Sequence, residues 1–465
     1  MVDAKLLSES QTTAFQKIIG CLTKSPPESG TTFMVQGAAG TGKTFLLNHI
    51  VAHCESKDIK AIALAYTGIA SCLLKKGKTV HSQFRIPWNQ KQIKCMLDST
   101  HPLYKTIETA KVLLWDQAAF CSKQIFEEVD RFLRVIMNTK QTFGGKLMVI
   151  SGDFNECLPI CKKTKFESAE SNSLLYSKLF KDMETFTLHE NQRFKSQTDY
   201  RFCVEIGCGI HTEVAVPSAC RVFSLDTLIN TTYGHDYESI SSNDLLDRSL
   251  LTVCAVDAEY LNNECIQRLY SANMVFHSLN FFRKINPNER SRFYSIEETM
   301  EDLPKYFPPK TLQLNKNCPI MLRQAYKGLP QGTRLVVKNI IGTSIIAEIG
   351  AGHRKVKTIS IYRVNTIKIF QRANLQFVRR QFPISLAFSM TINKAQGLQF
   401  NRVGVYFPVT AFAHGQMYVA FSRTPAIEEN MKVFVEEPND GRFTFDRMPN
   451  VVNGTVAKYL LQSQS

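Results

Sequence analysis

Residues 37–44 read GAAGTGKT, and this octapeptide has the G-x-x-x-x-G-K-[ST] spacing of a phosphate-binding loop. The apolar run 31–36 (TTFMVQ) predicts a buried strand before it, and 45–53 (FLLNHIVAH) predicts a helix after it. In that context backbone N–H groups and the helix N-terminus surround a phosphate, while Lys43 reaches the β- and γ-phosphates and Thr44 ligates Mg²⁺. A glycine-rich turn with a chance lysine is the weaker alternative, so the chain is expected to bind a nucleoside triphosphate.

More apolar runs follow at intervals that fit βαβ units: 61–66 (AIALAY), 111–116 (KVLLWD), 146–151 (KLMVIS) and 185–189 (TFTLH). Each is apolar nearly throughout, which is typical of parallel strands buried on both faces. Several end at a residue that can do chemistry, namely Thr67, Asp116 and Asp153. Because ligands of open α/β sheets bind outside the carboxyl ends of strands, we expect these ends to line one crevice.

Composition narrows the class of partner. Lys and Arg number 56 against 41 Asp and Glu, and the net charge of +15 makes nucleic acid the first candidate, with a merely solvated basic surface as the alternative. No secretory signal precedes the 13 cysteines, so reduced thiols in the cytosol or nucleus are expected. The following residues lack paired C-x-x-C spacing and are interpreted as ordinary side chains rather than zinc ligands: Cys157, Cys161, Cys203, Cys208 and His211.

The sequence pattern of the rest of the chain changes twice. Residues 211–250 carry many turn and polar residues and are expected to form an irregular insertion or linker. Residues 312–364 consist of short β-rich runs with glycine turns, the pattern of a small antiparallel barrel or sheet. Residues 382–435 return to α/β character, with strands expected at 382–390 (FPISLAFSM) and 402–408 (RVGVYFP). The sequence therefore predicts two α/β domains, the second interrupted by a small β module.

Three further residues have the chemistry of a triphosphatase. Asp116 ends a strand where phosphate-loop enzymes place the acidic partner of Mg²⁺, although aspartates also end strands as plain turn residues. Arg193 and Arg423 end the stretches LHENQR and MYVAFSR. An arginine that reaches the γ-phosphate from another domain stabilises transition-state charge, whereas either arginine alone is more often a surface residue.

Taken in order, the motifs resemble those of the superfamily 1B DNA helicases of the petite-integration-frequency (PIF) family, in particular the helicase domain of Helitron transposons. The matching stretches are GAAGTGKT (37–44), TGIASCLLKKGKTVHSQF (67–84), LLWDQA (113–118), FGGKLMVISGDFNECLPI (143–160), LHENQR (188–193), LPQGTRLVV (329–337), RRQFPISLAFSMTINKAQG (379–397) and HGQMYVAFSR (414–423). They run in family order over nearly the whole chain, and the last two are far more diagnostic than a phosphate loop alone.

The resemblance implies an α/β fold of two RecA-like P-loop NTPase domains with ATP and Mg²⁺ between them and a small β-barrel inserted in the second. The expected boundaries are 1–190 for the first domain, 191–305 and 379–465 for the second, and 306–378 for the barrel. It implies single-stranded DNA and duplex junctions as partners, 5′-to-3′ movement, and activity as a monomer on DNA. No membrane association is expected, and the expected location is the nucleus or a site of DNA replication.

The resemblance also implies site residues. For the nucleotide these are Gln11, resembling an adenine-reading glutamine, with Gly37, Ala38, Ala39, Gly40, Thr41, Gly42, Lys43 and Thr44. For catalysis they are Lys43, Asp116, Gln117, Glu156, Arg193 and Arg423, and for the metal Thr44 and Asp116. For DNA they are Thr67, Gly68, His81, Ser82, Phe84, Thr391, Asn393, Lys394 and Gln396. Phe84 has two equal interpretations, stacking on a base or packing in the core.

The chain departs from the family pattern at two informative positions. The family's second motif has Asp-Glu, with the glutamate as the base that activates water, and here Gln117 takes the glutamate's place. The third motif has a glutamine that senses the γ-phosphate, and here Glu156 stands there. We hypothesise that the two residues have exchanged roles; the rival is that drift removed the base and Glu156 is incidental. Leu398, Gln399 and Ser71 are smaller departures.

Three functions compete at this point. The first is an ATP-dependent DNA helicase, and the second is an ATP-binding DNA scaffold that has lost turnover through Gln117. The third is a phosphate-loop kinase of a small molecule, which the charge and the Arg423 motif disfavour. Since the motifs begin near residue 1 and end near the C-terminus, a stand-alone helicase of a large DNA virus or a domesticated transposon fragment is the expected layout, without a nuclease domain or targeting extension.

Overall fold

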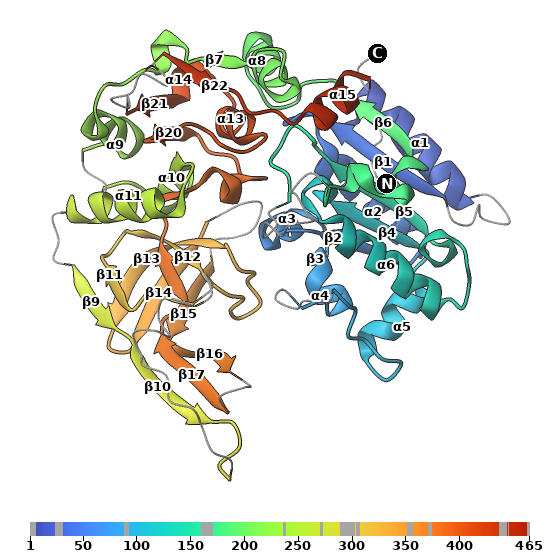
Figure 1. Cartoon of the computed structure of the whole chain (residues 1–465), viewed down its shortest axis with the longest axis horizontal. Helices are drawn as coiled ribbons and strands as arrows, with labels where there is room; N and C mark the ends of the chain where they lie inside the picture. The colour runs from blue at the N-terminus through green and yellow to red at the C-terminus, as the bar shows by residue number, and fades with distance from the viewer. Residues whose placement is uncertain are drawn as a thin grey trace.

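The computed structural model describes residues 6–23, 31–87, 93–159, 171–235, 239–269, 273–288, 303, 307–350, 357–370, 374–436, 444 and 446–462. Cys161 and Ile160, the last residue of one motif, lie outside these residues. In Figure 1 a first α/β domain lies on the right, a second on the upper left, and a β-rich part below the second. None of the described helices is both long and apolar enough to cross a membrane.

The first domain is built on a parallel six-stranded sheet. Its strands are β1 (Thr32–Gly37), β2 (Ala61–Ala65), β3 (Lys78–Thr79), β4 (Val112–Asp116), β5 (Leu147–Gly152) and β6 (Glu184–Leu188), in the order β3-β2-β4-β5-β1-β6. The five expected strands are confirmed within one residue at each end. Along β4 the side chains alternate between two cores, with Leu113 and Trp115 in one and Val112 and Leu114 in the other, as burial on both faces requires.

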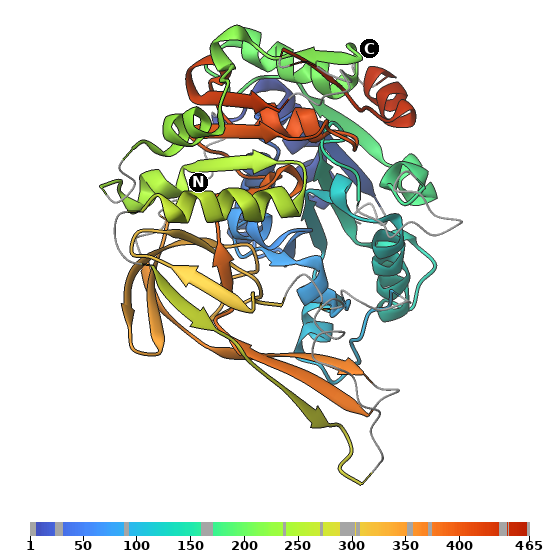
Figure 2. The same ribbon diagram turned by 60° about the vertical axis from the view of Figure 1, so that its left-hand side comes forward.

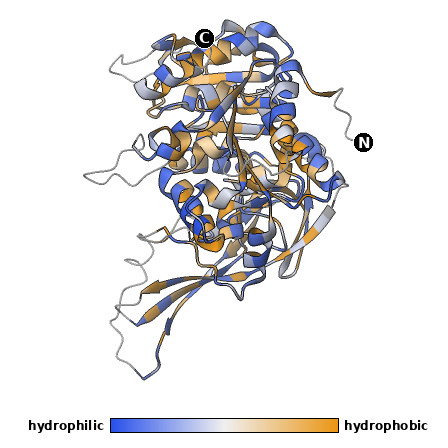
Figure 3. Ribbon diagram, turned by 90° about the vertical axis from the view of Figure 1, so that its right-hand side faces the viewer, coloured by the Kyte–Doolittle hydropathy of each residue, from blue (hydrophilic) through white to orange (hydrophobic). Residues whose placement is uncertain are grey.

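Helices cover both faces of this sheet. They are α1 (Glu9–Thr23), α2 (Lys43–Ser56), α3 (Gly68–Leu73), α4 (Val80–Phe84), α5 (Pro102–Thr109), α6 (Lys123–Ile136) and α7 (Lys178–Lys181). α1 and α2 supply apolar side chains to the core that holds Leu114, and α6 supplies Phe126 and Val129 to the core that holds Trp115. Figure 3 shows hydrophobic and hydrophilic residues on the same helices, as expected for helices with one face on a sheet.

The second domain has a parallel four-stranded sheet in the order β19-β8-β20-β21. Its strands are β8 (Arg248–Thr252), β19 (Ser389–Thr391), β20 (Arg402–Phe407) and β21 (Met431–Val435), and a small antiparallel pair joins β7 (Glu213–Ala215) to β22 (Arg447–Pro449). Its helices are α8 (Gln197–Cys208), α9 (Leu225–Tyr233), α10 (Ser242–Leu246), α11 (Ala255–Gln267), α13 (Gln416–Phe421) and α14 (Ile427–Asn430). The sheets of both domains agree with the predicted α/β class.

The expectation of an irregular linker over 211–250 is wrong. This stretch holds β7, α9, α10 and most of β8, and α9 buries Leu228, Ile229 and Tyr233 in the core of the second domain. The sequence pattern did not predict these helices, because their Ser, Thr and Asn residues favour turns in isolation. In the structure, Ser224 and Ser241 cap the N-termini of α9 and α10.

The β-rich part contains three antiparallel sheets: β15-β14-β13-β12-β18, β10-β17-β16 and β11-β9. Their strands are β9 (Met274–His277), β10 (Leu279–Lys284), β11 (Thr311–Leu314), β12 (Pro319–Leu322), β13 (Arg334–Ile341), β14 (Ser344–Ile349), β15 (Lys357–Tyr362), β16 (Val364–Phe370), β17 (Leu375–Gln381) and β18 (Ile384–Leu386). β10 and β17 extend away from the second domain as an arm (Figures 1 and 2). A closed barrel stays a prediction.

The expected limits of this part, 306 and 378, are too narrow. It begins with β9 and β10, which pair with β11 and β17, and it ends only after β18, which pairs with β12. The expected strand 382–390 is two strands, β18 in this part and β19 in the second domain. Local sequence does not show this division, since partners distant in the chain decide which sheet an apolar strand joins.

The last described helix, α15 (Gly454–Gln462), returns to the first domain (Figure 1). Val456 and Leu460 belong to the core that holds Trp115, and the Tyr459 ring meets Phe154 edge-on with centroids 5.2 Å apart. Thus the chain crosses between the two α/β domains a second time at its end.

Arg334 anchors the β-rich part to the second domain, and its removal should destabilise the protein. Its guanidinium donates to the carbonyl oxygens of Leu246 (2.7 Å), Arg248 (2.9 Å) and Ala387 (2.8 Å). We expect Arg334→Leu to lower the free energy of unfolding by about 2–4 kcal/mol, because three carbonyls lose their partner. Urea denaturation measures this, with the exposed Arg402→Leu as control; equal midpoints for the two variants would contradict the assignment.

Candidate nucleotide site between the two domains

The phosphate-binding loop (P-loop) connects β1 to α2 and has the backbone its motif predicts. Gly40 has a φ of 89°, a left-handed conformation that L side chains rarely adopt. A Cβ at Gly40 would also lie 2.7 Å from the Cβ of Arg193, so Arg193 packs directly on the loop. Thr41 Oγ1 donates to Ala38 O at 2.9 Å and holds the turn.

The two side chains expected to hold the nucleotide lie against this loop. Lys43 Nζ donates to the carbonyl oxygens of Gly37 (2.7 Å) and Ala38 (3.0 Å). Gln11, on α1, is 2% exposed, and its Nε2 donates to Thr41 O at 2.9 Å. The structure thus brings Gln11 of α1 to the P-loop and turns the Lys43 side chain back onto the backbone of that loop.

The predicted metal ligands touch one another. Thr44 Oγ1 donates to Asp116 Oδ2 at 2.6 Å, and Ser151 Oγ donates to Asp116 Oδ1 at 2.6 Å. All of these groups are oxygens, and Mg²⁺ prefers one or two protein oxygens together with waters and phosphate oxygens. The residues therefore fit Mg²⁺. Ser151 was missed in the sequence, where it looks like one more residue of a buried strand.

The second domain reaches the site through α13 and the residues that flank it. Tyr418 accepts the Ala39 N–H at 2.6 Å and donates to Asp153 Oδ2 at 2.6 Å. Arg423 Nη2 donates to Glu156 Oε1 at 3.1 Å, and His414 Nε2 lies 2.8 Å from Phe154 O. The contacts cover residues 153–156, the segment that follows β5 in the first domain. Tyr418 was not predicted, and its only sequence signal was its place inside the diagnostic stretch 414–423.

All five N–H groups of Arg423 have acceptors. Nε donates to Val419 O, Nη1 to Ala395 O and Leu398 O, and Nη2 to Ser422 Oγ and Glu156 Oε1. Four of these five acceptors belong to the second domain, so the Glu156 carboxylate is the one that crosses the interface. Arg423 is 1% exposed, and a guanidinium at such a depth requires a partner of opposite charge.

The charges around Glu156 oppose one another. Burial raises the pKa of the Glu156 carboxyl above its ordinary value, although the Arg423, Lys43 and Arg193 cations nearby favour the ionised form. Burial, together with repulsion from Arg423, lowers the pKa of Arg193 to about 10, and Arg193 Nη1 contacts Ser422 O at 3.4 Å. Arg193 therefore stays charged at neutral pH. Arg423 contacts this carboxylate directly at 3.1 Å, while Lys43 and Arg193 are near enough to favour its charged form.

Gln117 lies between the two segments expected to bind DNA. Its Oε1 accepts the Thr67 hydroxyl at 3.0 Å. A Cβ on Gly397 would lie 2.1 Å from Gln117 Nε2, so only a glycine allows this approach. Gln117 itself has a left-handed φ of 55°, an uncommon conformation that the surroundings must hold in place. Gln117, directly after β4, thus contacts Thr67 of the first domain and Gly397 of the second domain.

The expected DNA-binding residues divide by burial. Thr67, Gly68, Thr391 and Asn393 are half-buried, and Ser82 and Lys394 are exposed. A Cβ on Gly68 would lie 2.5 Å from Pro330 Cβ, which places the LPQG loop of the β-rich part beside this motif. These residues stay candidates for DNA contact.

Phe84, His81 and Gln396 do not reach the surface. Phe84 is 0% exposed and meets the Phe132 ring edge-on at 6.1 Å, so the base-stacking interpretation is wrong and the core interpretation is confirmed. His81 is also buried, with Nδ1 3.0 Å from Ile86 O. Gln396 is buried with its amide against the backbone of Cys157. Their expected contacts with DNA are corrected to structural ones, because each side chain turns toward the protein.

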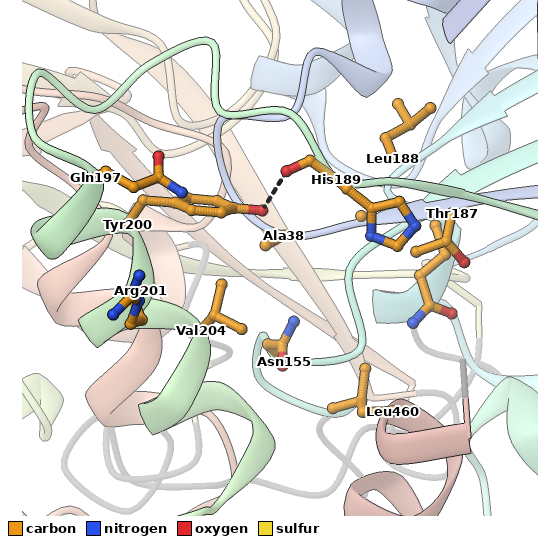
Figure 4. Close-up of a pocket in the computed structure, with 12 residues that line it drawn as sticks. Ala38, Asn155, Thr187, Leu188, His189, Gln197, Tyr200, Arg201, Val204 and Leu460 are labelled. Carbon is orange, nitrogen blue, oxygen red and sulfur yellow. Dashed lines mark hydrogen bonds between the residues drawn. The ribbon is translucent and has the colours of Figure 1, made fainter. Parts of the chain in front are cut away.

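A cavity of about 340 Å³ lies beside the first residues of the P-loop (Figure 4). It lies between the end of β6, α8 and α15, and Ala38, Asn155 and Val204 are among the residues that line it. Tyr200 OH donates to His189 O at 3.0 Å along one wall.

Replacing Phe84 should affect stability and leave DNA affinity unchanged. We expect Phe84→Ala to lower the free energy of unfolding by about 3–5 kcal/mol, because a fully buried ring leaves a cavity. The control is Phe132→Ala, since Phe132 contacts Phe84 and carries no expectation of DNA contact. Denaturant unfolding and fluorescence anisotropy with labelled single-stranded DNA measure the two quantities. Weaker DNA binding by the folded Phe84 variant alone would restore the stacking role.

Comparisons with known proteins agree with this geometry. Residues 6–202 match the family model described as PIF1-like helicase. The chain is 22% identical over 439 residues to the ATP-dependent DNA helicase PIF1 of Danio rerio, which covers 91% of this chain and 60% of the relative. It is 22% identical over 462 residues to the Pif1 helicase of Campylobacter jejuni, covering 91% of this chain and 93% of the relative. The chain thus spans about 60% of the length of the vertebrate relatives it matches.

Solved Pif1 structures share the fold over the whole chain. A Pif1 helicase structure at forked double-stranded DNA has a TM-score of 0.70 at 20% identity, covering 99% of this chain and 97% of that one. Pif1 from Candida albicans has a TM-score of 0.68 at 19% identity, covering 99% and 100%. Residues 6–202 therefore match the PIF1-like helicase family model, and the chain as a whole shares its fold with solved Pif1 helicases.

Proposed function

We propose that this chain is an ATP-dependent DNA helicase that moves 5′-to-3′ along single-stranded DNA and unwinds duplexes. The observation that carries the proposal is the contact of Arg423 with Glu156, since it brings an arginine of the second domain to the segment after β5, the strand that pairs with the P-loop strand β1. This is the arrangement that couples triphosphate hydrolysis to domain closure. The second support is the match of residues 6–202 to the PIF1-like helicase model.

In this proposal the nucleotide takes over contacts that the protein now makes with itself. Lys43 would exchange the carbonyls of Gly37 and Ala38 for phosphate oxygens, and Arg193, which packs on Gly40, would supply positive charge to the γ-phosphate. A phosphate between Arg193 and Arg423 relieves the repulsion of the two cations. Thr44 and Asp116 would hold Mg²⁺, which supplies positive charge to the phosphates. A Bacteroides Pif1 was solved with ADP-AlF3 and single-stranded DNA, which supports the same ligands here.

The proposed DNA track runs over Thr67, Gly68, Ser82, Thr391, Asn393 and Lys394. Hydroxyl, amide and backbone groups of this kind follow a phosphate backbone without reading its sequence. Gln117 contacts Thr67 and lies against Gly397, so the end of β4 beside the metal site touches both DNA segments. This connection offers a physical route from the nucleotide to the DNA. Duplex junctions are the proposed substrates. The proposed location is the nucleus or another site of DNA replication.

We further propose that Glu156 serves as the base of hydrolysis in place of the missing glutamate at position 117. Glu156 lies among Lys43, Arg193 and Arg423, and its raised pKa suits a group that accepts a proton. Gln117 cannot accept a proton, and its Oε1 is engaged by Thr67. The competing function is a DNA-binding scaffold that binds ATP without hydrolysing it. Two observations favour the scaffold: Gln117 stands in place of the catalytic glutamate, and every N–H group of Arg423 already has an acceptor.

Direction and activity are tested together on tailed duplexes. We expect ATP hydrolysis to rise by about tenfold or more with single-stranded DNA. Unwinding is expected on a duplex with a 5′ tail and not on one with a 3′ tail. ATP and DNA binding without hydrolysis would instead identify the scaffold. An ATP hydrolysis rate that is the same with and without single-stranded DNA would contradict the helicase function and favour the small-molecule kinase.

The role of Glu156 is tested by exchanging the two unusual residues. We expect Glu156→Gln to lower kcat by about 10²-fold or more, as for loss of a general base. Glu128→Gln is the control, since Glu128 is a buried carboxylate paired with Arg131 at another place in the first domain. Normal hydrolysis by Glu156→Gln would exclude the exchange of roles. If the wild type does not hydrolyse ATP and Gln117→Glu restores hydrolysis, drift has removed the base.

A further inference from the structure

One side chain of the second domain contacts the P-loop backbone itself. Tyr418 lies on α13, and its hydroxyl bridges Ala39 N and Asp153 Oδ2, each at 2.6 Å. It is 1% exposed, Ala39 is 6% exposed and Asp153 is likewise 6% exposed. The bridge therefore joins three buried groups from the P-loop, the segment after β5 and the opposite domain.

The chemistry of the bridge requires a hydroxyl. The Ala39 N–H can only donate, whereas the Asp153 carboxylate can only accept, and a hydroxyl does both at once. The other oxygen of Asp153 is already occupied, because Oδ1 accepts from the backbone and side-chain nitrogens of Asn155. Burial, with the Asp153 charge beside it, raises the pKa of Tyr418 well above its ordinary value, so the hydroxyl keeps its proton.

The position of Ala39 in the loop gives the bridge a consequence for the nucleotide. Ala39 directly precedes Gly40, on which Arg193 packs, and the backbone N–H groups that surround phosphate lie in this loop and at the start of α2. A bond from the second domain to the Ala39 N–H sets the orientation of this peptide. Separation of the domains must break the bond and leave the N–H and the carboxylate to water.

We propose that Tyr418 is a positioning residue that sets the P-loop and Asp153 for hydrolysis when the second domain closes and releases both when it opens. This inference rests on the proposed ATPase function. It differs from the role of Arg423, whose contact across the interface is with Glu156, because Tyr418 acts on the P-loop backbone through Ala39.

The test compares Tyr418→Phe with Tyr233→Phe in the full chain. Tyr233 is also fully buried in the second domain, and its hydroxyl donates to Phe388 O, a contact remote from the P-loop. Both variants lose one buried hydroxyl and keep the ring, so Tyr233→Phe controls for the loss of a buried hydroxyl as such. We expect only Tyr418→Phe to lower the kcat of DNA-stimulated ATP hydrolysis, by about tenfold, with KM for ATP within about twofold.

A second measurement does not depend on turnover. Hydrogen–deuterium exchange of the P-loop peptide should accelerate by about threefold or more in Tyr418→Phe and stay unchanged in Tyr233→Phe. Unchanged P-loop exchange in Tyr418→Phe would overturn the inference, as would a kcat equal to that of the control. If the wild type hydrolyses no ATP, the proposed function fails, while the exchange experiment still decides the role of Tyr418.

Discussion

The buried contact between residues 153–156 and the stretch 414–423 is the constraint on which the nucleotide site depends. Arg423 is almost fully inaccessible, and four of its five acceptors come from its own domain. The fifth, Glu156, has the opposite charge and belongs to the other domain. A buried cation that loses its counterion is strongly destabilised, so this pair favours the closed arrangement until another anion replaces the carboxylate. A γ-phosphate is an anion of the right kind.

Parallel sheets explain how so many functional groups meet. Asp116 ends β4 and Gln117 follows it, residues 153–156 follow β5, and the P-loop lies at the end of β1, which pairs with β5. The carboxyl ends of these neighbouring strands therefore open on one edge. The second domain presents the region after β19 and the helix α13 to the same edge. Each group comes from a short loop on a rigid sheet, which limits its movement to that of the whole domain.

The two departures from the family pattern have different surroundings. Glu156 lies among cations, and a carboxylate there makes an ion pair that a glutamine would not make. The Gln117 amide accepts from the Thr67 hydroxyl and lies against Gly397. An amide suits this place because it accepts from one group while approaching another closely. The structure thus gives each exchanged residue a local physical reason, beside any role in hydrolysis.

The sequence by itself determined the features that depend on neighbours in the chain. The P-loop spacing, the strand before it and the buried strands of the first domain follow from glycine positions and apolar runs, and all were located within a residue. Only the tertiary structure decided that Phe84 lies in the core, that 382–390 divides between two sheets, and that Tyr418 and Ser151 belong to the site. These facts depend on which distant segment covers a side chain. An apolar run or a tyrosine has the same local pattern whether a strand, a helix or another domain lies opposite.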